Sequence, residues 1–422
     1  MKTKSSFIAA SWPVTRFVAV LLLALTPLAH GGTETVLHNF GSGSDGKYPS
    51  SALIVDSAGN LYGTTSAGSS AGFGTVFKLT PNGGGFTESL VYSFRGSANE
   101  DGAFPQGALT ADAAGNFYGV TSYGGHYDCG TVFELTAGGG GSWTESVLYS
   151  FCADGKESDG DFPSGKLIFD SSGNLYGVTQ AGGAHGGGAV FQLTPASGKW
   201  TQTVLYSFDR AGRSSGTQPV GIIFDSAGNI DGVTLFGGDK FYNGPGIVFQ
   251  LVQNPPGRWT QKIIHRFSIS GKTAQTPTGG LALDAAGNLY MTMGRGGRGG
   301  AGVVELSPKS GGGFTARDLY SFDGPQLLQS YEDLVFDSAG NLYSASQYGG
   351  ANGGGGTGFG FIYKLSPGSS RWTGTKLATF HGWDGVYPIG GVILDSKGNL
   401  YGATYYRDPG FKGAGVVFQV TP

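Results

Sequence analysis

The stretch Asp56-Ser57-Ala58-Gly59-Asn60-Leu61-Tyr62-Gly63 decides the fold, because the chain repeats its pattern seven times. All seven copies have the form Asp-x-x-Gly-Asn, and the others begin at Asp112, Asp170, Asp225, Asp284, Asp337 and Asp395. Successive aspartates lie 56, 58, 55, 59, 53 and 58 residues apart. A nearly constant period of this length indicates a repeat architecture.

The repeated stretch has the chemistry of a tight turn between two strands. An apolar run such as Leu53–Val55 leads into it. The aspartate carboxylate can accept hydrogen bonds from backbone N–H groups just ahead. The glycine supplies the positive φ that such a hairpin turn needs. Seven equivalent carboxylates could also suggest seven metal sites, but turn chemistry is the interpretation that we favour.

Each unit reads as four short strands. In the first unit these are expected at Ala52–Asp56, Asn60–Ser66, Thr75–Thr80 and Glu88–Phe94, since β-branched and aromatic runs between Gly, Asn and Pro are typical of strands. The fourth residue of the third strand is polar in every unit and varies in charge, which predicts a solvated rim; it is Lys78, Glu134, Gln192, Gln250, Glu305, Lys364 or Gln419.

The two ends of the chain predict how the repeat closes. The last unit supplies three strands and stops at Pro422, and the missing fourth strand corresponds to the segment Glu34–Phe40. We therefore expect an all-β, seven-bladed β-propeller with four antiparallel strands per blade, whose last blade is completed by the N-terminal strand. Closure would cover strand edges that otherwise promote aggregation. The propeller should occupy residues 33–422 as one domain.

Composition and charge limit where the protein can reside and which partners it can bind. Residues 1–30 carry Lys2, Lys4 and Arg16 around an apolar run that is too short to anchor the mature chain, and they are typical of a signal peptide. Its removal leaves 23 basic and 29 acidic residues. This acidic balance argues against a nucleic-acid partner. We expect a monomer without a membrane span, secreted or held in the periplasm or at the cell surface.

The two cysteines, Cys129 and Cys152, bracket the last hairpin of the second unit. If Thr136 pairs with Glu145, the same register places the two cysteines opposite each other at the mouth of the hairpin. Export permits a disulfide, which we expect in preference to two free thiols. Two cysteines alone are a poor metal site.

Binding residues are expected on the face of the ring that carries the loops between second and third strands and the links between units. Function tends to reside on variable loops held by a rigid scaffold. The candidate ligand-binding residues there are His126, Tyr127, Asp128, Asp239, Tyr242, Arg295, Tyr348, Tyr406, Arg407 and Asp408.

Four of the links between units share the pattern Asp-Gly-x-aromatic-Pro. They begin at Asp45, Asp101, Asp159 and Asp384. The interpretation that we favour is a turn, followed by an aromatic ring that packs over the blade and a proline that starts the strand. The alternative is calcium held by these four aspartates, because Ca²⁺ needs several oxygen ligands. No other cofactor is expected.

Catalytic motifs are weak. His126 near Asp128 could serve acid–base chemistry, but a single His-x-Asp in a loop is a weak signal. A pair of carboxylates for glycoside hydrolysis needs a separation that the sequence does not give. Tyrosine and tryptophan on an acidic, exported surface do suit stacking against sugars.

The consensus of the units is Gly-Thr-Val-Phe-x-Leu-Thr-Pro, then Val-Leu-Tyr-Ser-Phe, Asp-Gly-x-x-Pro and Asp-x-x-Gly-Asn-Leu-Tyr-Gly-x-Thr, and residues 130–136, 147–151 and 170–179 follow it closely. It resembles the GloVer tandem repeat of exported bacterial proteins described as choice-of-anchor, over nearly all of residues 33–422. The resemblance implies export and a propeller-like repeat, and it implies no catalytic residues. Relatives often carry an anchoring tail. Because the chain stops at its last strand, we expect release or periplasmic residence.

The expected function is that of a non-catalytic binding or scaffold module that recognises glycan or protein at the cell surface. The alternative is a carbohydrate-active enzyme, a lyase or hydrolase, working on the loop face. A purely structural role in a surface layer is a third possibility.

Overall fold

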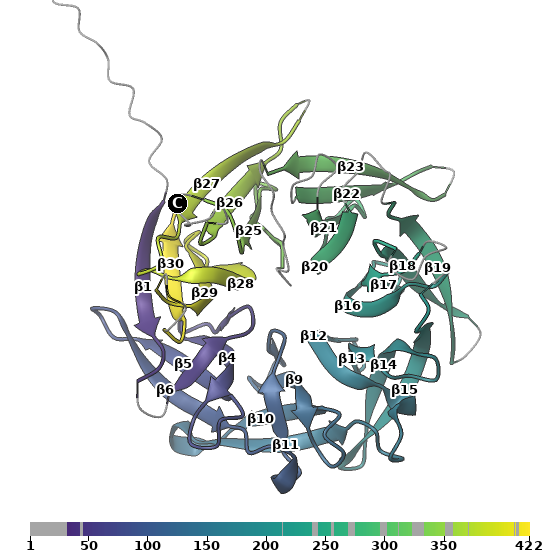
Figure 1. The fold of residues 1–422 in the computed structure, drawn as a ribbon, viewed down its shortest axis with the longest axis horizontal. Helices are drawn as coiled ribbons and strands as arrows, with labels where there is room; N and C mark the ends of the chain where they lie inside the picture. Colours follow the sequence, from purple (N-terminus) through teal and green to yellow (C-terminus); the bar gives the residue numbers. More distant parts are fainter. Residues whose placement is uncertain are drawn as a thin grey trace, which may run out of the picture. The chain divides into compact units, whose positions relative to one another are not determined.

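The computed structural model describes residues 32–42, 45–212, 214–238, 244–254, 257–268, 275–295, 302–310, 312–322, 333–350, 358–369, 371–408, 410 and 413–422. Gly32–Pro422 form one compact unit. Its strands pair in seven antiparallel sheets, which surround a common axis as the blades of a propeller (Figure 1). The predicted seven-bladed β-propeller is confirmed.

The strands are numbered in chain order, and each blade runs from its innermost to its outermost strand. Blade 1 holds β2 (Gly46–Pro49), β3 (Ile54–Val55), β4 (Leu61–Gly68), β5 (Thr75–Pro81) and β6 (Phe86–Ser93). Blade 2 holds β7 (Gly102–Pro105), β8 (Thr110–Ala111), β9 (Phe117–Gly124), β10 (Thr131–Ala137) and β11 (Trp143–Ser150). Blade 3 holds β12 (Asp161–Phe169), β13 (Leu175–Ala181), β14 (Gly186–Ala196) and β15 (Lys199–Asp209). Blade 4 holds β16 (Thr217–Phe224), β17 (Ile230–Phe236), β18 (Ile247–Asn254) and β19 (Arg258–Arg266).

Blade 5 holds β20 (Gln275–Leu283), β21 (Leu289–Arg295), β22 (Gly302–Pro308) and β23 (Phe314–Ser321). Blade 6 holds β24 (Val335–Phe336), β25 (Leu342–Ser346), β26 (Phe361–Ser366) and β27 (Thr373–Thr379). Blade 7 holds β28 (Val386–Leu394), β29 (Leu400–Tyr406), β30 (Val416–Thr421) and β1 (Thr33–Asn39). Among the described residues the helices are three 3-10 turns, at Ser97–Asn99, Gly139–Gly141 and Glu157–Asp159.

Blade 7 closes the ring by joining the two ends of the propeller. β1 pairs antiparallel with β30, from Thr33 opposite Thr421 to Asn39 opposite Val416, with one bulge between Val36 and His38. In Figure 1 the N-terminal strand lies beside the C-terminal one. The outer edge of β30 is thereby covered, and closure by the N-terminal strand is confirmed.

The Asp-x-x-Gly-Asn stretch forms a turn whose aspartate satisfies four donors. Asp56 Oδ1 accepts the amides of Ala58 and Asn60, both at 2.9 Å. Its Oδ2 accepts the side-chain amide of Asn60 at 2.7 Å and the hydroxyl of Tyr62 at 3.1 Å. The same network recurs at the other copies, except that Asp231 replaces the tyrosine in blade 4. Turn chemistry therefore accounts for the seven repeated aspartates.

The strand bounds differ from the sequence-based ones at the innermost strand, which begins earlier than predicted. In blade 1 it starts at Gly46 and is interrupted between Pro49 and Ile54. The predicted solvated rim is also only partly correct, since its side chains are half-buried or, for Glu305, buried. Four of them contact the tyrosine of the second strand, as where the Tyr118 hydroxyl donates to Glu134 Oε1 at 2.7 Å. In blade 4, Gln250 instead donates to Asp231 Oδ1 at 2.9 Å.

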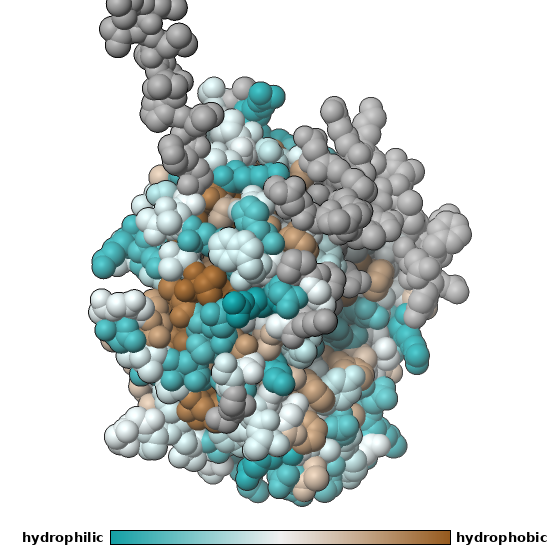
Figure 2. Space-filling model, turned by 60° about the vertical axis from the view of Figure 1, so that its left-hand side comes forward, coloured by the Kyte–Doolittle hydropathy of each residue, from teal (hydrophilic) through white to brown (hydrophobic). Residues whose placement is uncertain are grey.

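The hydrophobic core lies between the blades. In six of the seven blades, a phenylalanine at the end of the outermost strand meets a phenylalanine on the third strand of the next blade, edge to face; Phe94 and Phe133 have ring centroids 5.1 Å apart. Equivalent contacts join Phe40 to Phe77, Phe151 to Phe191, Phe208 to Phe249, Phe322 to Phe361 and Phe380 to Phe418. In blade 4, Phe267 instead belongs to a core cluster that includes Val304 of blade 5. Gly63 leaves room for the Phe77 ring, because a Cβ there would collide with it. On the flank that Figure 2 turns forward, apolar residues form small patches separated by hydrophilic ones.

Candidate functional site

We call one end of the ring the link face. It carries the loops that follow β4, β9, β13, β17, β25 and β29, together with the links that precede β2, β7, β12, β16 and β28. The other end, the turn face, carries the Asp-x-x-Gly-Asn turns. The antiparallel pairing of consecutive strands in every blade fixes this division, as the sequence predicted.

Five tyrosines form one continuous group on the link face of blades 6, 7 and 1. Tyr48 stacks on Tyr405 with ring centroids 5.2 Å apart, and it meets Tyr406 edge to face at 5.5 Å. Tyr387 lies 6.2 Å from Tyr406 and 4.8 Å from Tyr348. All five rings are half-buried. Burial raises the pKa of the Tyr348, Tyr387 and Tyr406 hydroxyls, so these groups stay protonated. The group therefore offers partly accessible aromatic rings.

A tryptophan and an arginine extend this group outward. Trp383 is 68% exposed, and its ring lies parallel to that of His381, with centroids 6.3 Å apart. The Nε of Arg407, whose side chain is exposed, donates to the carbonyl of Trp383 at 3.3 Å. An exposed indole beside a guanidinium is a surface on which a ligand ring can stack and accept hydrogen bonds. We call Tyr48, Tyr348, Trp383, Tyr387, Tyr405, Tyr406 and Arg407 the aromatic surface.

Asp408 shapes the loop that carries Arg407. Its amide donates to the carbonyl of Gly382 at 2.7 Å, and its Oδ1 accepts the amide of Gly410 at 2.7 Å. Its φ is 75°, in the left-handed region. The structure thus brings Tyr348, Tyr406, Arg407 and Asp408 together, as the sequence predicted for one face, with Asp408 holding the backbone.

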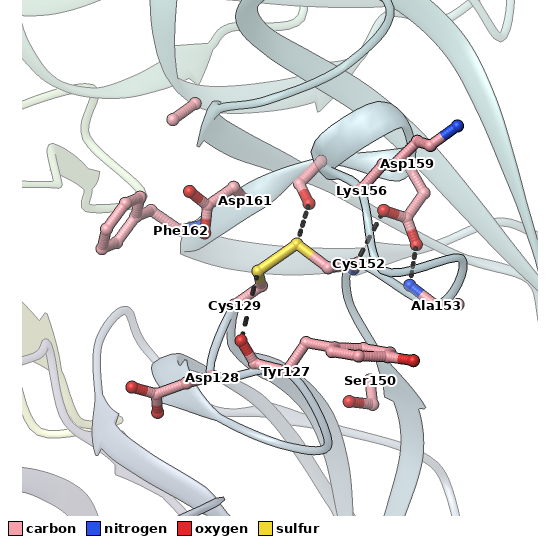
Figure 3. The surroundings of a disulfide bond; sticks show 12 residues. Tyr127, Asp128, Cys129, Ser150, Cys152, Ala153, Lys156, Asp159, Asp161 and Phe162 are labelled. Atoms are coloured by element: carbon pink, nitrogen blue, oxygen red, sulfur yellow. Dashed lines mark hydrogen bonds between the residues drawn. A yellow bond between two sulfur atoms is a disulfide. The ribbon is translucent and has the colours of Figure 1, made fainter.

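The second group of candidates lies on blade 2. His126 Nδ1 is 3.3 Å from Glu100 Oε1, and the His126 ring meets Tyr127 edge to face. Asp128 Oδ1 accepts the amide of Gly124 at 2.9 Å, which gives it a role in the loop rather than as a partner of His126. Figure 3 shows Tyr127 and Asp128 beside the disulfide, with their side chains pointing apart. This group lies on blade 2, whereas the aromatic surface lies on blades 6, 7 and 1.

Cys129 and Cys152 form a disulfide with Cα atoms 6.0 Å apart, which confirms the expected pairing. The register argument behind it was off by one residue, because Thr136 lies opposite Thr144 rather than Glu145. A bulge between Val132 and Phe133 adds one residue to the outer strand, so that Val132 faces Tyr149. The bulge brings the cysteines opposite each other.

The four aspartates of the Asp-Gly-x-aromatic-Pro links each accept hydrogen bonds from their own link. Asp101 accepts the Arg95 amide and the Tyr92 hydroxyl, both at 2.9 Å, and Asp159 accepts the Cys152 amide and the Tyr149 hydroxyl. Asp384 accepts the amide and Nδ1 of His381, and Asp45 accepts the Gly41 amide and lies 3.3 Å from His38 Nε2.

The four carboxylates lie in links of four different blades. Among the described residues, the one cluster of three potential metal ligands is Cys129, Cys152 and Asp161, and its two sulfurs are joined in the disulfide. Calcium binding by the four aspartates stays a prediction.

Comparison with known sequences identifies the repeat. The model of the Gloeobacter/Verrucomicrobia repeat matches residues 22–240, 144–305 and 276–422. The chain belongs to this repeat family. The resemblance seen in the sequence is thereby confirmed. No curated protein matches the chain.

Two solved structures are similar in outline to this member of the Gloeobacter/Verrucomicrobia repeat family. One is a Dyadobacter fermentans protein of unknown function, with 12% identity, a TM-score of 0.43 and coverage of 93% of this chain and 99% of that one. The other is a luciferin-regenerating enzyme, with 13% identity, a TM-score of 0.44 and coverage of 93% and 96%. Likeness at this level carries no argument about function. In the part of the chain that the structure describes, no helix is long and apolar enough to cross a membrane.

Three predicted site residues cannot be placed, and four residues of the aromatic surface were not among the predicted candidates: Tyr48, Trp383, Tyr387 and Tyr405. Asp239 and Tyr242 lie outside the described residues, and Arg295 ends β21 with a side chain that is not described. Tyr48 and Tyr387 were interpreted only as packing residues of the repeated link. Trp383 stands between Gly382 and Asp384, and a tryptophan in a glycine-containing link was a signal that could have identified it.

Proposed function

We propose that this Gloeobacter/Verrucomicrobia repeat protein is an exported, non-catalytic binding module that recognises glycan through the aromatic surface on blades 6, 7 and 1. The observation that carries the proposal is Trp383. It is by far the most exposed large apolar side chain among the described residues, and it lies next to Arg407 and the tyrosine group.

Sugar rings present apolar C–H faces and a rim of hydroxyls. Aromatic rings pack against the faces, and a guanidinium donates to the hydroxyls. The tyrosines are held against one another and against the rigid blades, so little conformational entropy is lost when a ligand settles on them. The net negative charge of the mature chain favours a neutral or cationic glycan over an acidic one.

The test is binding to a panel of polysaccharides, measured by affinity electrophoresis and calorimetry with the full mature chain. Trp383→Ala and Tyr406→Ala should each weaken binding about tenfold or more, because removal of one stacking ring at a binding hot spot costs more than about 1 kcal/mol. Tyr406→Phe should retain most of the affinity, since it keeps the ring.

Phe236→Ala is the matched control. Phe236 holds the position in β17 that Tyr406 holds in β29, and it is 39% exposed, but it lies on blade 4. The control variant should bind as the wild type does. Equal binding by the wild type and by Trp383→Ala would contradict the proposal. Parallel titrations with EDTA test the calcium prediction at Asp45, Asp101, Asp159 and Asp384.

A further inference from the structure

A cavity of about 320 Å³ lies on the propeller axis. Its lining comes from the innermost strand of all seven blades, with Gln180 added from a second strand. The volume lies at the small end of the range for small-molecule sites. The cavity is separate from the aromatic surface, none of whose residues lines it.

One repeat position dominates the cavity wall. The residue four places before each turn aspartate lines it in six blades, and four of these residues are small: Ala52, Ala108, Gly221 and Gly280. The other two carry opposite charges, Lys166 in blade 3 and Asp333 in blade 6. These blades lie across the ring from each other. The small residues leave the space between the two charges open.

Neither charge is used by the fold. The Lys166 side chain is exposed and Asp333 is half-buried, and neither side chain has a hydrogen bond or ion pair with any described residue. Burial raises the pKa of the Asp333 carboxyl, and the positive charge of Lys166 lowers it.

The setting of Asp333 is shaped for a carboxylate. A Cβ at Gly280 in the neighbouring blade would collide with Asp333 Oδ1, so the glycine there makes room for the charged group. The Asp333 backbone is held in place, because its carbonyl accepts the Ser344 hydroxyl at 2.9 Å. Ion pairs that serve stability normally touch and are hydrogen-bonded, because desolvated charges without partners are costly. Lys166 and Asp333 instead face an open space between them.

We propose that the axial cavity binds a small zwitterion of the amino-acid class, whose carboxylate meets Lys166 and whose ammonium group meets Asp333. Ser164, Thr278 and Gln106 also line the cavity and can hydrogen-bond the ligand. This site is independent of the glycan surface.

The probes are the unbranched amino acids from glycine to 6-aminohexanoate, titrated calorimetrically into the full mature chain. The series measures the span between the two charges. At least one length should bind. Its N-acetyl derivative lacks the cation and its amide lacks the anion, and each should bind at least tenfold more weakly, because a charged group would be left without its partner.

Two variants test the residues. Lys166→Met and Asp333→Asn should each weaken binding at least tenfold. Lys156→Met, which removes an exposed lysine that does not line the cavity, and Trp383→Ala should leave binding unchanged. Absence of binding by the whole series, equal binding of the capped analogues, or unchanged binding by both cavity variants would overturn the proposal. If a cavity variant fails to fold, the proposal is decided by comparing the binding of free and capped amino acids to the wild-type protein.

Discussion

The backbone amide of Tyr48 donates a hydrogen bond of 2.8 Å to the carbonyl of Ala414, and so joins blade 1 to blade 7. Phe104 makes the same bond to Phe73 of the preceding blade, and Tyr387 makes it to Phe359. In each case the donor precedes a proline and has a φ near 60°. Such a conformation is costly for a residue with a side chain, so the contacts between blades hold it in place.

Thr276 also precedes a proline with a left-handed φ, and among such residues it should gain most from glycine. It has a φ of 62°, and a β-branched residue is especially strained there. Thr276→Gly should raise the unfolding free energy by about 1 kcal/mol, measured by denaturant titration. Thr203→Gly in β15, an exposed strand position, should lower it by a similar amount. Destabilisation by Thr276→Gly would contradict the account of strain.

The turn aspartates should be structural. Asp112→Ala removes acceptors for the amides of Ala114 and Asn116, the Asn116 side chain and the Tyr118 hydroxyl. The expected loss is about 2–3 kcal/mol of unfolding free energy, since donors are left without partners. Asp154→Ala, at an exposed link residue, is the control and should cost less. A calcium-dependent stability of the wild-type protein that Asp112→Ala reduces would favour the metal interpretation instead.

Two glutamates of the outermost strands, Glu34 and Glu145, should make the free energy of unfolding fall as the pH rises. Burial, aided by Asp384, raises the pKa of Glu34 to about 8, and burial, aided by Asp101, raises that of Glu145 to about 7. The unfolded chain releases these protons near 4.5, so the folded state binds more protons between 4.5 and about 8. The unfolding free energy should therefore decrease as the pH rises through this window.

In Glu145→Gln, the decrease of the unfolding free energy between acid pH and pH 8 should be smaller by on the order of 1 kcal/mol. The chain itself holds glutamine at this repeat position in blades 3 and 4, where Gln202 donates to the carbonyl of Asp159 and Gln261 to that of Ser215. Denaturant titrations from pH 5 to pH 9 check this. An unchanged pH profile in Glu145→Gln would show that Glu145 is ionised in the folded protein.

The disulfide should stabilise blade 2 without shaping the aromatic surface. Replacing Cys129 and Cys152 by serine should lower the unfolding free energy by about 2–4 kcal/mol, because a loop of 23 residues is no longer closed in the unfolded chain. Glycan binding should be unchanged. Equal stability of the wild-type protein with and without reductant would contradict this expectation.

The fold could be predicted from the sequence because each unit repeats its turn chemistry and its strand pattern. The missing fourth strand of the last unit was enough to place Thr33–Asn39 in blade 7. Strand register was harder to predict, because a bulge such as that at Val132 and Phe133 has no recognisable sequence pattern.

The candidate sites were harder to predict, for two physical reasons. Residues that face one another across the ring, such as Lys166 and Asp333, are far apart in the chain and become neighbours of one cavity only after closure. Aromatic residues at repeated link positions, such as Tyr48 and Tyr387, both pack and remain partly accessible, so a sequence pattern cannot separate the two roles.

Ring closure is tested most directly by spin labels on Thr33 and Thr421, which are exposed and directly paired in blade 7. Paired residues of antiparallel strands have Cα atoms about 5 Å apart. The continuous-wave electron paramagnetic resonance spectrum of the doubly labelled chain should therefore show strong dipolar broadening. A chain labelled at Thr33 and at Thr203 of blade 3 should show none. A spectrum of the Thr33 and Thr421 pair equal to the sum of the two single labels would contradict closure.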